Sequence, residues 1–146
     1  MKKIVGILLM INTMCFSQQN KEIEKPIRNL FLGMKNADSE LVKSAFAENA
    51  VLQTITKDGT VKDDSVQDFI ISVSQFTKGD LDERIVIEAI HTDGNLASVF
   101  TPYSFYLKGK LSHCGANSFQ LVKQSNEWKI QYIIDTRRKE KCKEIE

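Results

Sequence analysis

The second half of the chain is a succession of long β-prone stretches, and this feature limits the fold more than any other. Short turn signals separate the stretches: Asp93-Gly94 favours a two-residue hairpin, and Lys108-Gly109-Lys110 provides the next turn. The predicted strands cover residues 82–92, 96–107, 111–123 and 128–135. Because tight turns join consecutive strands, the sequence predicts an antiparallel meander.

Helical periodicity dominates the residues before this meander. Apolar residues recur at three- and four-residue spacing on one face of a first helix: Ile23, Ile27, Leu30, Phe31 and Met34. Pro26 fits this helix only in its first turn, because further in it removes a backbone hydrogen bond. A second helix is predicted over about 38–47, and a third begins near Asp64 or Ser65 after a hairpin across Asp58-Gly59. Helices followed by strands indicate an α+β fold, with three N-terminal helices packed in a strongly curved antiparallel sheet.

The first seventeen residues have the three-part pattern of a secretory signal peptide. Two lysines form a positive start, an apolar run covers residues 4–16, and Cys15 and Ser17 stand where a cleavage site needs small residues. The run is shorter than the about 20 residues that a membrane-spanning helix needs, so no stable membrane insertion is expected. We therefore predict an exported protein, periplasmic or secreted, with residues 18–146 as its single domain. The alternatives are a buried N-terminal helix or strand and a lipid anchor on Cys15.

The charge of the chain argues against nucleic acid as a partner. Loss of the two N-terminal lysines with the leader would take the formal net charge from +1 to −1. A near-neutral domain lacks the basic surface that nucleic acid or anionic lipid requires. The one basic cluster, Arg137-Arg138-Lys139, is followed by mixed charges and indicates a solvated, mobile tail over about 137–146.

Two cysteines, Cys114 and Cys142, remain after residue 17. In an oxidising compartment an even pair can form a disulfide. Because Cys142 lies in the charged tail, the alternative is a buried free Cys114 and an exposed Cys142. The sequence leaves both open.

Strand parity predicts a hollow on one face of the sheet. Five alternating residues of the third predicted strand share that face: His113, Gly115, Asn117, Phe119 and Leu121. The face therefore changes from polar and small to apolar along its length. Apolar walls with a few convergent polar groups are typical of ligand pockets.

The neighbouring strands add aromatic residues to this prediction. Tyr103 and Phe105 share one face of the strand 96–107, and Trp128 and Tyr132 share the core face of the last strand. Simple parity puts Asp135 on the solvent face instead.

The strand 96–107 also carries aromatic residues on its other face, among them Phe100 and Tyr106. An aromatic outer face suggests a covered surface, most simply a homodimer formed through the sheet. Pro102 marks an edge or a bulge in this strand.

Several short segments together carry a family resemblance: Tyr103-Ser-Phe-Tyr, Ser112-His-Cys-Gly, Ser118-Phe-Gln-Leu-Val-Lys, Trp128-Lys-Ile and Asp135-Thr-Arg-Arg. With these segments the chain resembles the putative lumazine-binding branch of the nuclear-transport-factor-2-like superfamily. The resemblance implies a curled antiparallel sheet wrapped round helices to leave a conical cavity, often paired into dimers through the sheet. The superfamily includes cofactor-free isomerases, dehydratases and cyclases beside members that only bind or assemble, so one fold hosts many functions.

Two residues are candidates for acid–base chemistry. His113 on the pocket face could exchange a proton near neutral pH, or it could be a structural histidine bonded to a neighbouring element. Asp135 matches the cavity carboxylate that the resemblance implies for the enzyme relatives. That role needs a bulge at Ile133-Ile134 to turn Asp135 inward, and the alternative is an ion pair with Arg137 or Arg138.

Other chemistries lack their motifs. The chain has two histidines and no C-x-x-C or H-E-x-x-H, which argues against a zinc site. Its glycines form neither a G-x-G-x-x-G nor a phosphate-binding loop, and no G-x-S-x-G is present. Adjacent strand residues point to opposite faces, so His113 and Cys114 cannot act as a catalytic pair. We expect neither a metal nor a cofactor.

The sequence therefore favours a dimeric, exported small-molecule-binding protein that has no catalytic activity. The predicted pocket residues are Tyr103, Phe105, His113, Asn117, Trp128 and Tyr132. The alternative is a cofactor-free isomerase or dehydratase with Asp135 or His113 as general base. A third hypothesis is an assembly protein whose hollow is plugged by Phe31, Phe105 and Trp128.

Overall fold

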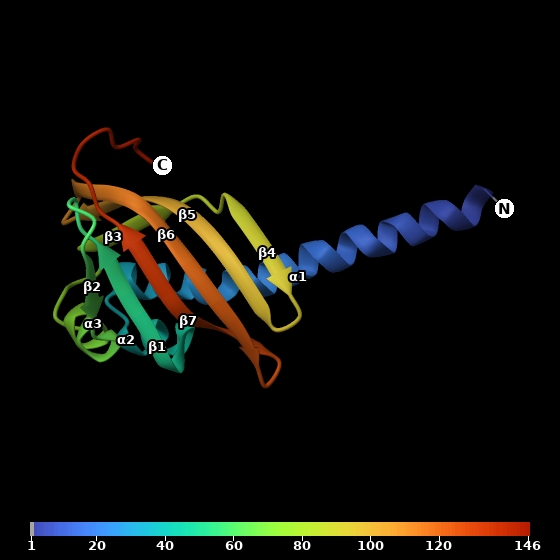
Figure 1. Cartoon of the computed structure of the whole chain (residues 1–146), viewed down its shortest axis with the longest axis horizontal. Coiled ribbons are helices and arrows are strands. Elements are labelled where there is room, and N and C mark those ends of the chain that lie inside the picture. The colour runs from blue at the N-terminus through green and yellow to red at the C-terminus, as the bar shows by residue number, and fades with distance from the viewer. Residues whose placement is uncertain (1) are drawn as a thin grey trace.

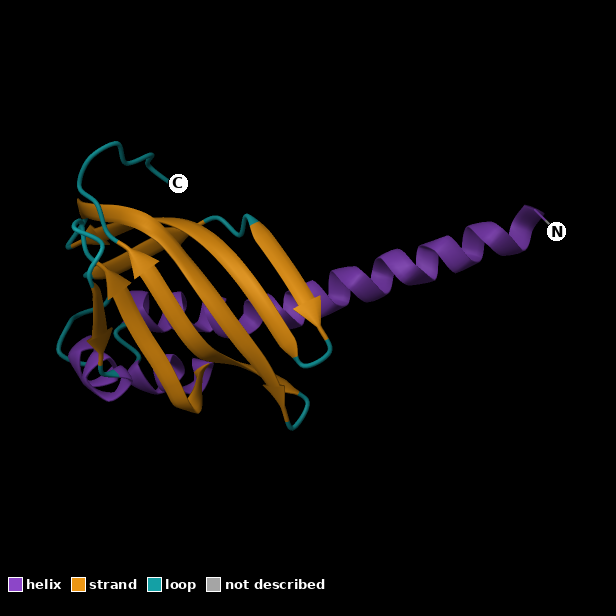
Figure 2. Ribbon diagram, in the orientation of Figure 1, coloured by secondary structure: helices purple, strands orange, loops and turns teal. Residues whose placement is uncertain are grey.

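The computed structural model describes the backbone of residues 2–146 and the side-chain surroundings from residue 18 onward. In chain order its elements are α1 (Lys2–Asn36), α2 (Ser39–Ala45), β1 (Phe46–Ile55), β2 (Val61–Asp64), α3 (Val66–Val73), β3 (Leu81–Ile85), β4 (Ala89–Asp93), β5 (Leu96–Leu107), β6 (Lys110–Gln124) and β7 (Glu127–Thr136). The strands form one curved sheet, and the helices lie on its concave side (Figures 1 and 2). The α+β class is confirmed.

The sheet is mixed, which corrects the antiparallel sheet that we predicted. Its strand order is β2-β1-β7-β6-β5-β3, with β4 also paired to β5. Every pair is antiparallel except β1 and β7, which run parallel. Tight turns fix the direction of strands that are consecutive in the chain. Since β1 and β7 are far apart in sequence, no turn signal constrains their relative direction.

The single strand predicted over 82–92 is two strands, β3 and β4. Both pair with β5, and the chain between them keeps two backbone hydrogen bonds, from Val86 N–H to the Pro102 carbonyl and from Glu88 N–H to the Phe100 carbonyl. Pro102 has no N–H to return, so a regular ladder cannot continue past it. The irregularity predicted at Pro102 therefore interrupts the neighbouring strand.

Helix α1 is continuous through Pro26, contrary to the prediction that this residue fits only a first turn. Pro26 leaves the carbonyl of Glu22 without its helical partner, but its ring is buried beside Ile23 and Ile27. Burial on the core face offsets this loss. The predicted signal peptide, residues 1–17, lies almost wholly in the N-terminal part of α1, which projects beyond the sheet in Figure 1. Its removal stays a prediction. Along the described helices, no segment has both the length and the apolarity to cross a bilayer.

The other two helices begin at side-chain caps. Asp38 accepts a hydrogen bond from Leu41 N–H at 2.9 Å, and Ser65 accepts one from Asp68 N–H at 3.1 Å. Such caps satisfy backbone donors that have no partner inside the helix. Helix α3, which begins after the cap at Ser65, contributes to the cavity described below.

The apolar faces of α1 and the sheet meet in one core. Phe31 of α1 packs edge-on against Phe119 of β6 with ring centroids 6.2 Å apart, and Phe46 packs in the same way against Phe69 of α3 at 6.4 Å. Edge-to-face pairs of this kind add to the free energy gained from burial. The core therefore joins the helices to the sheet at two places, α1 to β6 and α3 to β1.

A bulge in β7 reverses the parity of that strand. Ile130 pairs with Leu121 and Tyr132 pairs with Gln120, so Gln131 is the extra residue. As a result Asp135 turns inward and is 6% exposed. The bulge lies two residues before the Ile133-Ile134 position that we considered.

The same bulge places Tyr132 on the outer face, so its prediction as a pocket residue is wrong. Its hydroxyl donates to Oε1 of Gln53 at 2.6 Å, across the parallel β1–β7 pair.

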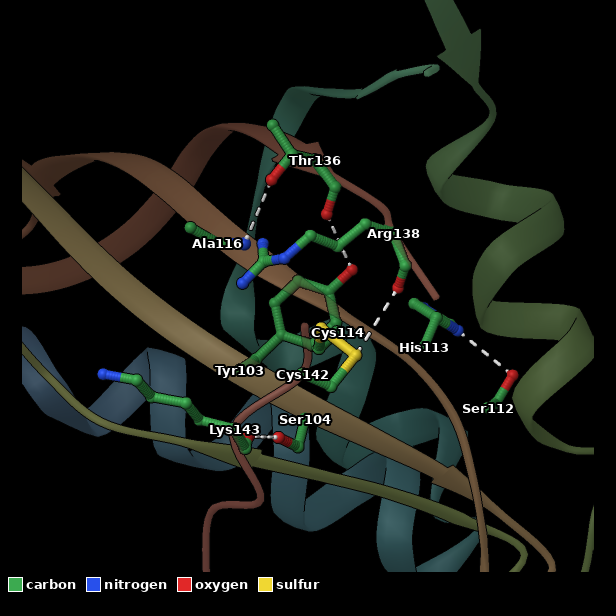
Figure 3. The surroundings of a disulfide bond; sticks show 10 residues. All are labelled: Tyr103, Ser104, Ser112, His113, Cys114, Ala116, Thr136, Arg138, Cys142 and Lys143. Carbon is green, nitrogen blue, oxygen red and sulfur yellow. Dashed lines mark hydrogen bonds between the residues drawn. A yellow bond between two sulfur atoms is a disulfide. The ribbon is translucent and has the colours of Figure 1, made fainter. Parts of the chain in front are cut away.

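The C-terminal segment covers part of the outer face of the sheet. A disulfide joins Cys114 of β6 to Cys142, and the hydroxyl of Ser104 on β5 donates to the Lys143 carbonyl at 2.6 Å (Figure 3). Arg84 stacks over the Tyr106 ring at 4.3 Å and donates to the Ile145 carbonyl. The C-terminal segment, which we predicted to be a solvated, mobile tail, is thus attached to the sheet at these residues.

This attachment also changes the interpretation of the aromatic outer face. Ser104 and Tyr106 are buried by the chain's own C-terminal segment, where a second copy was expected. Phe100 remains 42% exposed. The homodimer stays a prediction.

Candidate functional site

A cavity of about 690 Å³ lies between the inner face of the sheet, α1 and α3. Six phenylalanines from both layers supply most of its apolar wall: Phe31, Phe46, Phe69, Phe76, Phe105 and Phe119. Phe31 and Phe105 line the space without filling it, and Trp128 is buried elsewhere in the core. The predicted plug of these three residues is therefore not formed.

The polar end of the cavity is built on a row of residues across three strands. Thr101 of β5 pairs with Asn117 of β6, which pairs with Asp135 of β7. The amide nitrogen of Asn117 donates to Oε1 of Glu83 at 2.9 Å, and Thr101 Oγ1 lies 3.4 Å from the same nitrogen. This row brings Glu83 of β3 to the cavity beside Asp135.

Asp135 is held from two sides through one oxygen. Its Oδ2 accepts a hydrogen bond from Arg137 Nε at 2.9 Å and lies 3.2 Å from the Tyr103 hydroxyl. Its Oδ1 is buried and has no donor among the residues that the structure describes. The two interpretations of Asp135 from sequence, ion pair and cavity carboxylate, are both present in the structure.

Glu83 is a weaker acid than an ordinary carboxyl group. Burial raises its pKa to about 7, because the charged form loses hydration, and the nearby negative charge of Asp135 raises it further. The hydrogen bond from Asn117 and the charge of Arg137 oppose this shift but do not cancel it. Glu83 is therefore partly protonated at neutral pH and can accept or donate a proton.

His113 faces the cavity, as its strand parity predicts. Its ring lies 4.9 Å from that of Phe105, and its Nδ1 is 3.1 Å from the Ser112 hydroxyl (Figure 3). Burial lowers the pKa of His113, and the positive charge of Arg137 lowers it further, so the ring is neutral at pH 7. No hydrogen bond connects His113 to either carboxylate in the described part of the chain.

Gly115 allows this arrangement because it has no side chain. A Cβ at this position would collide with the carbonyl of Thr136 and come within 2.8 Å of the Tyr103 ring. The carbonyl of Thr136 accepts from the Tyr103 hydroxyl at 2.9 Å (Figure 3). Close packing at Gly115 therefore positions the tyrosine that contacts Asp135.

The structure separates the predicted pocket residues into three groups. Phe105, His113 and Asn117 line the cavity. Tyr103 stands behind Asp135 and reaches the site through its hydroxyl. Trp128 and Tyr132 are outside it.

Sequence reasoning missed Glu83, and a signal for it was available. Leu81, Glu83 and Ile85 alternate on one face of β3, so an acid stands between two apolar residues on the inner side. The acids Asp63, Asp64 and Asp68, which also line the cavity, gave no such signal because they lie around a helix start, where acids commonly act as caps.

Comparisons with solved structures identify the fold. The chain matches a nuclear-transport-factor-2-like protein of unknown function from Shewanella baltica OS155 with a TM-score of 0.70 and 18% identity, over 85% of this chain and 97% of that one. A similar protein from Silicibacter pomeroyi DSS-3 matches with a TM-score of 0.69 and 14% identity, over 84% and 98%. A protein of unknown function with a cystatin-like fold from Nostoc punctiforme PCC 73102 matches with a TM-score of 0.66 and 12% identity, over 83% of this chain and 92% of that one. At these identities the likeness concerns the fold alone.

A comparison with curated proteins gave no match. A comparison with protein families matched residues 18–132 to the family described as putative lumazine-binding. The match covers most of the chain, including β3, β5 and β6, and it ends at residue 132, before Asp135 and Arg137. The chain therefore belongs to the family described as putative lumazine-binding, and it has the fold of the nuclear-transport-factor-2-like proteins.

Proposed function

We propose that this protein binds a small molecule in the cavity between α1, α3 and the sheet. The observation that carries the proposal is the cavity itself, which has about 690 Å³ of space, aromatic walls and one polar end. Pockets for small ligands have volumes of about 300–1,000 Å³ and this division of lining. The polar end would fix the orientation of the ligand, and the phenylalanine rings would supply most of the area that contacts it.

The family description supports the same conclusion. Lumazine is a flat heteroaromatic molecule, and flat rings stack favourably between aromatic side chains. We propose that the ligand of this protein is flat or compact enough to lie between Phe31, Phe69 and Phe119.

We further propose that the protein works outside the cytoplasm, after loss of residues 1–17. The disulfide between Cys114 and Cys142 supports this location, because disulfides persist in oxidising compartments. The homodimer remains part of the proposal, with the exposed Phe100 on the outer face as its supporting residue.

A second candidate function, proton transfer on the bound molecule, is favoured by Glu83. A general base works best when its pKa is near the working pH, and the pKa of Glu83 is about 7. Asp135 is already engaged by Arg137, and His113 has no carboxylate partner, so Glu83 is better placed than either. Exchange of deuterium into a bound carbon acid, abolished in Glu83→Gln, would establish this function over simple binding.

Native mass spectrometry of the purified protein tests the binding proposal. The wild type should carry a co-purified molecule that dissociates on activation. Ser72→Trp, which inserts a large ring into the cavity from α3, should lose it. Ser74→Trp is the matched control, because Ser74 is exposed at the end of the same helix. An identical adduct on both variants, or none on the wild type, contradicts the proposal.

A further inference from the structure

The charged residues of the cavity are unequal in sign. Four carboxyl groups of its lining can face it: Asp64, Asp68, Glu83 and Asp135. Asp63 also borders the cavity, but its carboxylate accepts a hydrogen bond from Gln53 Nε2 at 2.6 Å, on the outer face that Gln53 shares with Tyr132. Among the described lining residues the one guanidinium is that of Arg137, and no lysine is present. The imidazole of His113 adds no positive charge at neutral pH. The electrostatic potential inside the cavity is therefore negative.

Arg137 is already used within the protein. Its Nε contacts Asp135 Oδ2 at 2.9 Å, and its terminal nitrogen lies 4.0 Å from Asp64 Oδ2. The other two acids that can face the cavity, Glu83 and Asp68, form no ion pair with any described residue. An anionic ligand would meet these carboxylates without a free cation to receive it.

An independent observation points to a missing donor. Asp135 is 6% exposed, and its Oδ1 has no hydrogen-bond partner among the described residues, although the residue lines the cavity. A buried acceptor without a donor is unfavourable, and natural proteins rarely leave one. A ligand that brings N–H donors to this end of the cavity would remove the deficit.

The distribution of the acids favours an organic cation over a metal ion. In the part of the chain that the structure describes, no three acidic, histidine or cysteine side chains gather closely enough to hold a metal. The opposite wall consists of phenylalanine rings, whose faces attract organic cations and offer no ligand to a metal.

We propose that the ligand is an organic cation, with a protonated amine, amidine or guanidine attached to a flat or apolar body. Its cationic group lies between Glu83, Asp135 and the acids at the start of α3, and its body lies among the phenylalanines. This inference rests on the proposed binding function and names the chemical class that the site takes.

A matched set of three probes tests the class by isothermal titration of the purified protein at pH 8. The probes share a naphthalene ring and differ in charge: 2-naphthylmethylamine, 2-naphthalenemethanol and 2-naphthoate. We expect the amine to bind at least about tenfold more tightly than the alcohol, and the carboxylate to bind most weakly. The preference for the amine should shrink when the salt concentration is raised, because the acids at the start of α3 are partly exposed.

Variants connect the preference to the named residues. Glu83→Gln should weaken binding of the amine by about tenfold and change binding of the alcohol by less than about twofold, because the substitution removes only a charge. Asp68→Asn removes a charge at an exposed position and should likewise weaken binding of the amine more than binding of the alcohol. Glu88→Gln, exposed and outside the lining, is the matched control and should bind all three probes as the wild type does.

The outcomes separate this inference from the proposal on which it rests. If the alcohol or the carboxylate binds as tightly as the amine, the cationic class is overturned while small-molecule binding stands. If none of the three binds, the class is again overturned. The adduct comparison between Ser72→Trp and Ser74→Trp then decides small-molecule binding separately.

Discussion

The hydroxyl of Tyr103 lies 3.2 Å from Oδ2 of Asp135, although the two residues are on strands separated by β6. The contact crosses Gly115, the residue of β6 that pairs with Tyr103, because no side chain stands there. Burial raises the pKa of the Tyr103 hydroxyl, so it remains a donor across the physiological range. The polar end of the cavity thus depends on close backbone packing as well as on charge.

Replacing Tyr103 by Phe should destabilise the protein. The change removes the donor to the Thr136 carbonyl and the contact with Oδ2 of Asp135, which keeps its bond from Arg137, at a cost of about 1 kcal/mol. Urea unfolding measures the loss. Tyr106→Phe is the control, because its hydroxyl makes one long contact of 3.5 Å with Glu144 and its removal should cost less than about 0.5 kcal/mol. Equal losses would contradict the role assigned to Tyr103.

Replacing Gly115 by Ala should lower the free energy of unfolding by about 1–3 kcal/mol or more, because the new methyl group overlaps the Thr136 carbonyl. Thermal unfolding followed by circular dichroism measures the effect. Ser118→Ala, on the outer face of the same strand, is the control and should change stability by less than about 0.5 kcal/mol. A Gly115→Ala protein as stable as this control would show that β7 does not lie against Gly115.

Glu83 should make stability depend on pH. Its pKa is about 7 in the folded protein, above the value of about 4.5 that it has when unfolded. Between these values the folded state holds more protons than the unfolded state, so this group's contribution to stability falls as pH rises from 4.5 to 7.

The variant Glu83→Gln removes that dependence. When the pH is raised from 5 to 8, the free energy of unfolding of Glu83→Gln minus that of the wild type should increase by about 2 kcal/mol. Guanidinium unfolding at the two pH values measures the difference, with Glu88→Gln as an exposed control that should follow the wild type. Parallel pH profiles for Glu83→Gln and the wild type would contradict a buried, partly protonated Glu83.

Reduction of the disulfide should destabilise the protein and release its tail. Cys114 and Cys142 are 28 residues apart, and closing a loop of that size in the unfolded chain is worth about 3–4 kcal/mol. Cys142→Ala should lower the free energy of unfolding by the same amount, and dithiothreitol should then have no further effect on the unfolding of this variant. A wild type that unfolds at the same denaturant concentration with and without dithiothreitol would rule out the bridge.

Local signals in the sequence predicted most of the fold. The caps at Asp38 and Ser65 and the alternation along β6 depend on residues close together in the chain, and each appears in the structure. The tight turn predicted at Asp93-Gly94 is present one residue later, at Gly94-Asn95, with Asp93 paired to Leu96. The face of His113 followed from the same alternation.

Features that depend on distant pairing were not predictable in this way. The bulge at Gln131 arises from how β7 fits β6, and it decides that Asp135 faces inward while Tyr132 faces outward. The parallel pairing of β1 with β7 likewise has no local signal. The alternation along β3 shows that Glu83 faces inward, but its bond from Asn117, on a strand that is not its neighbour, has no local signal.

A crystal structure of the purified protein, solved without any added ligand, tests the binding of a small molecule most directly. We predict electron density for a compact molecule between Phe31, Phe69 and Phe119, with its polar group toward Glu83. A cavity that contains only ordered water, or one closed by rearranged phenylalanine rings, would contradict the proposed function.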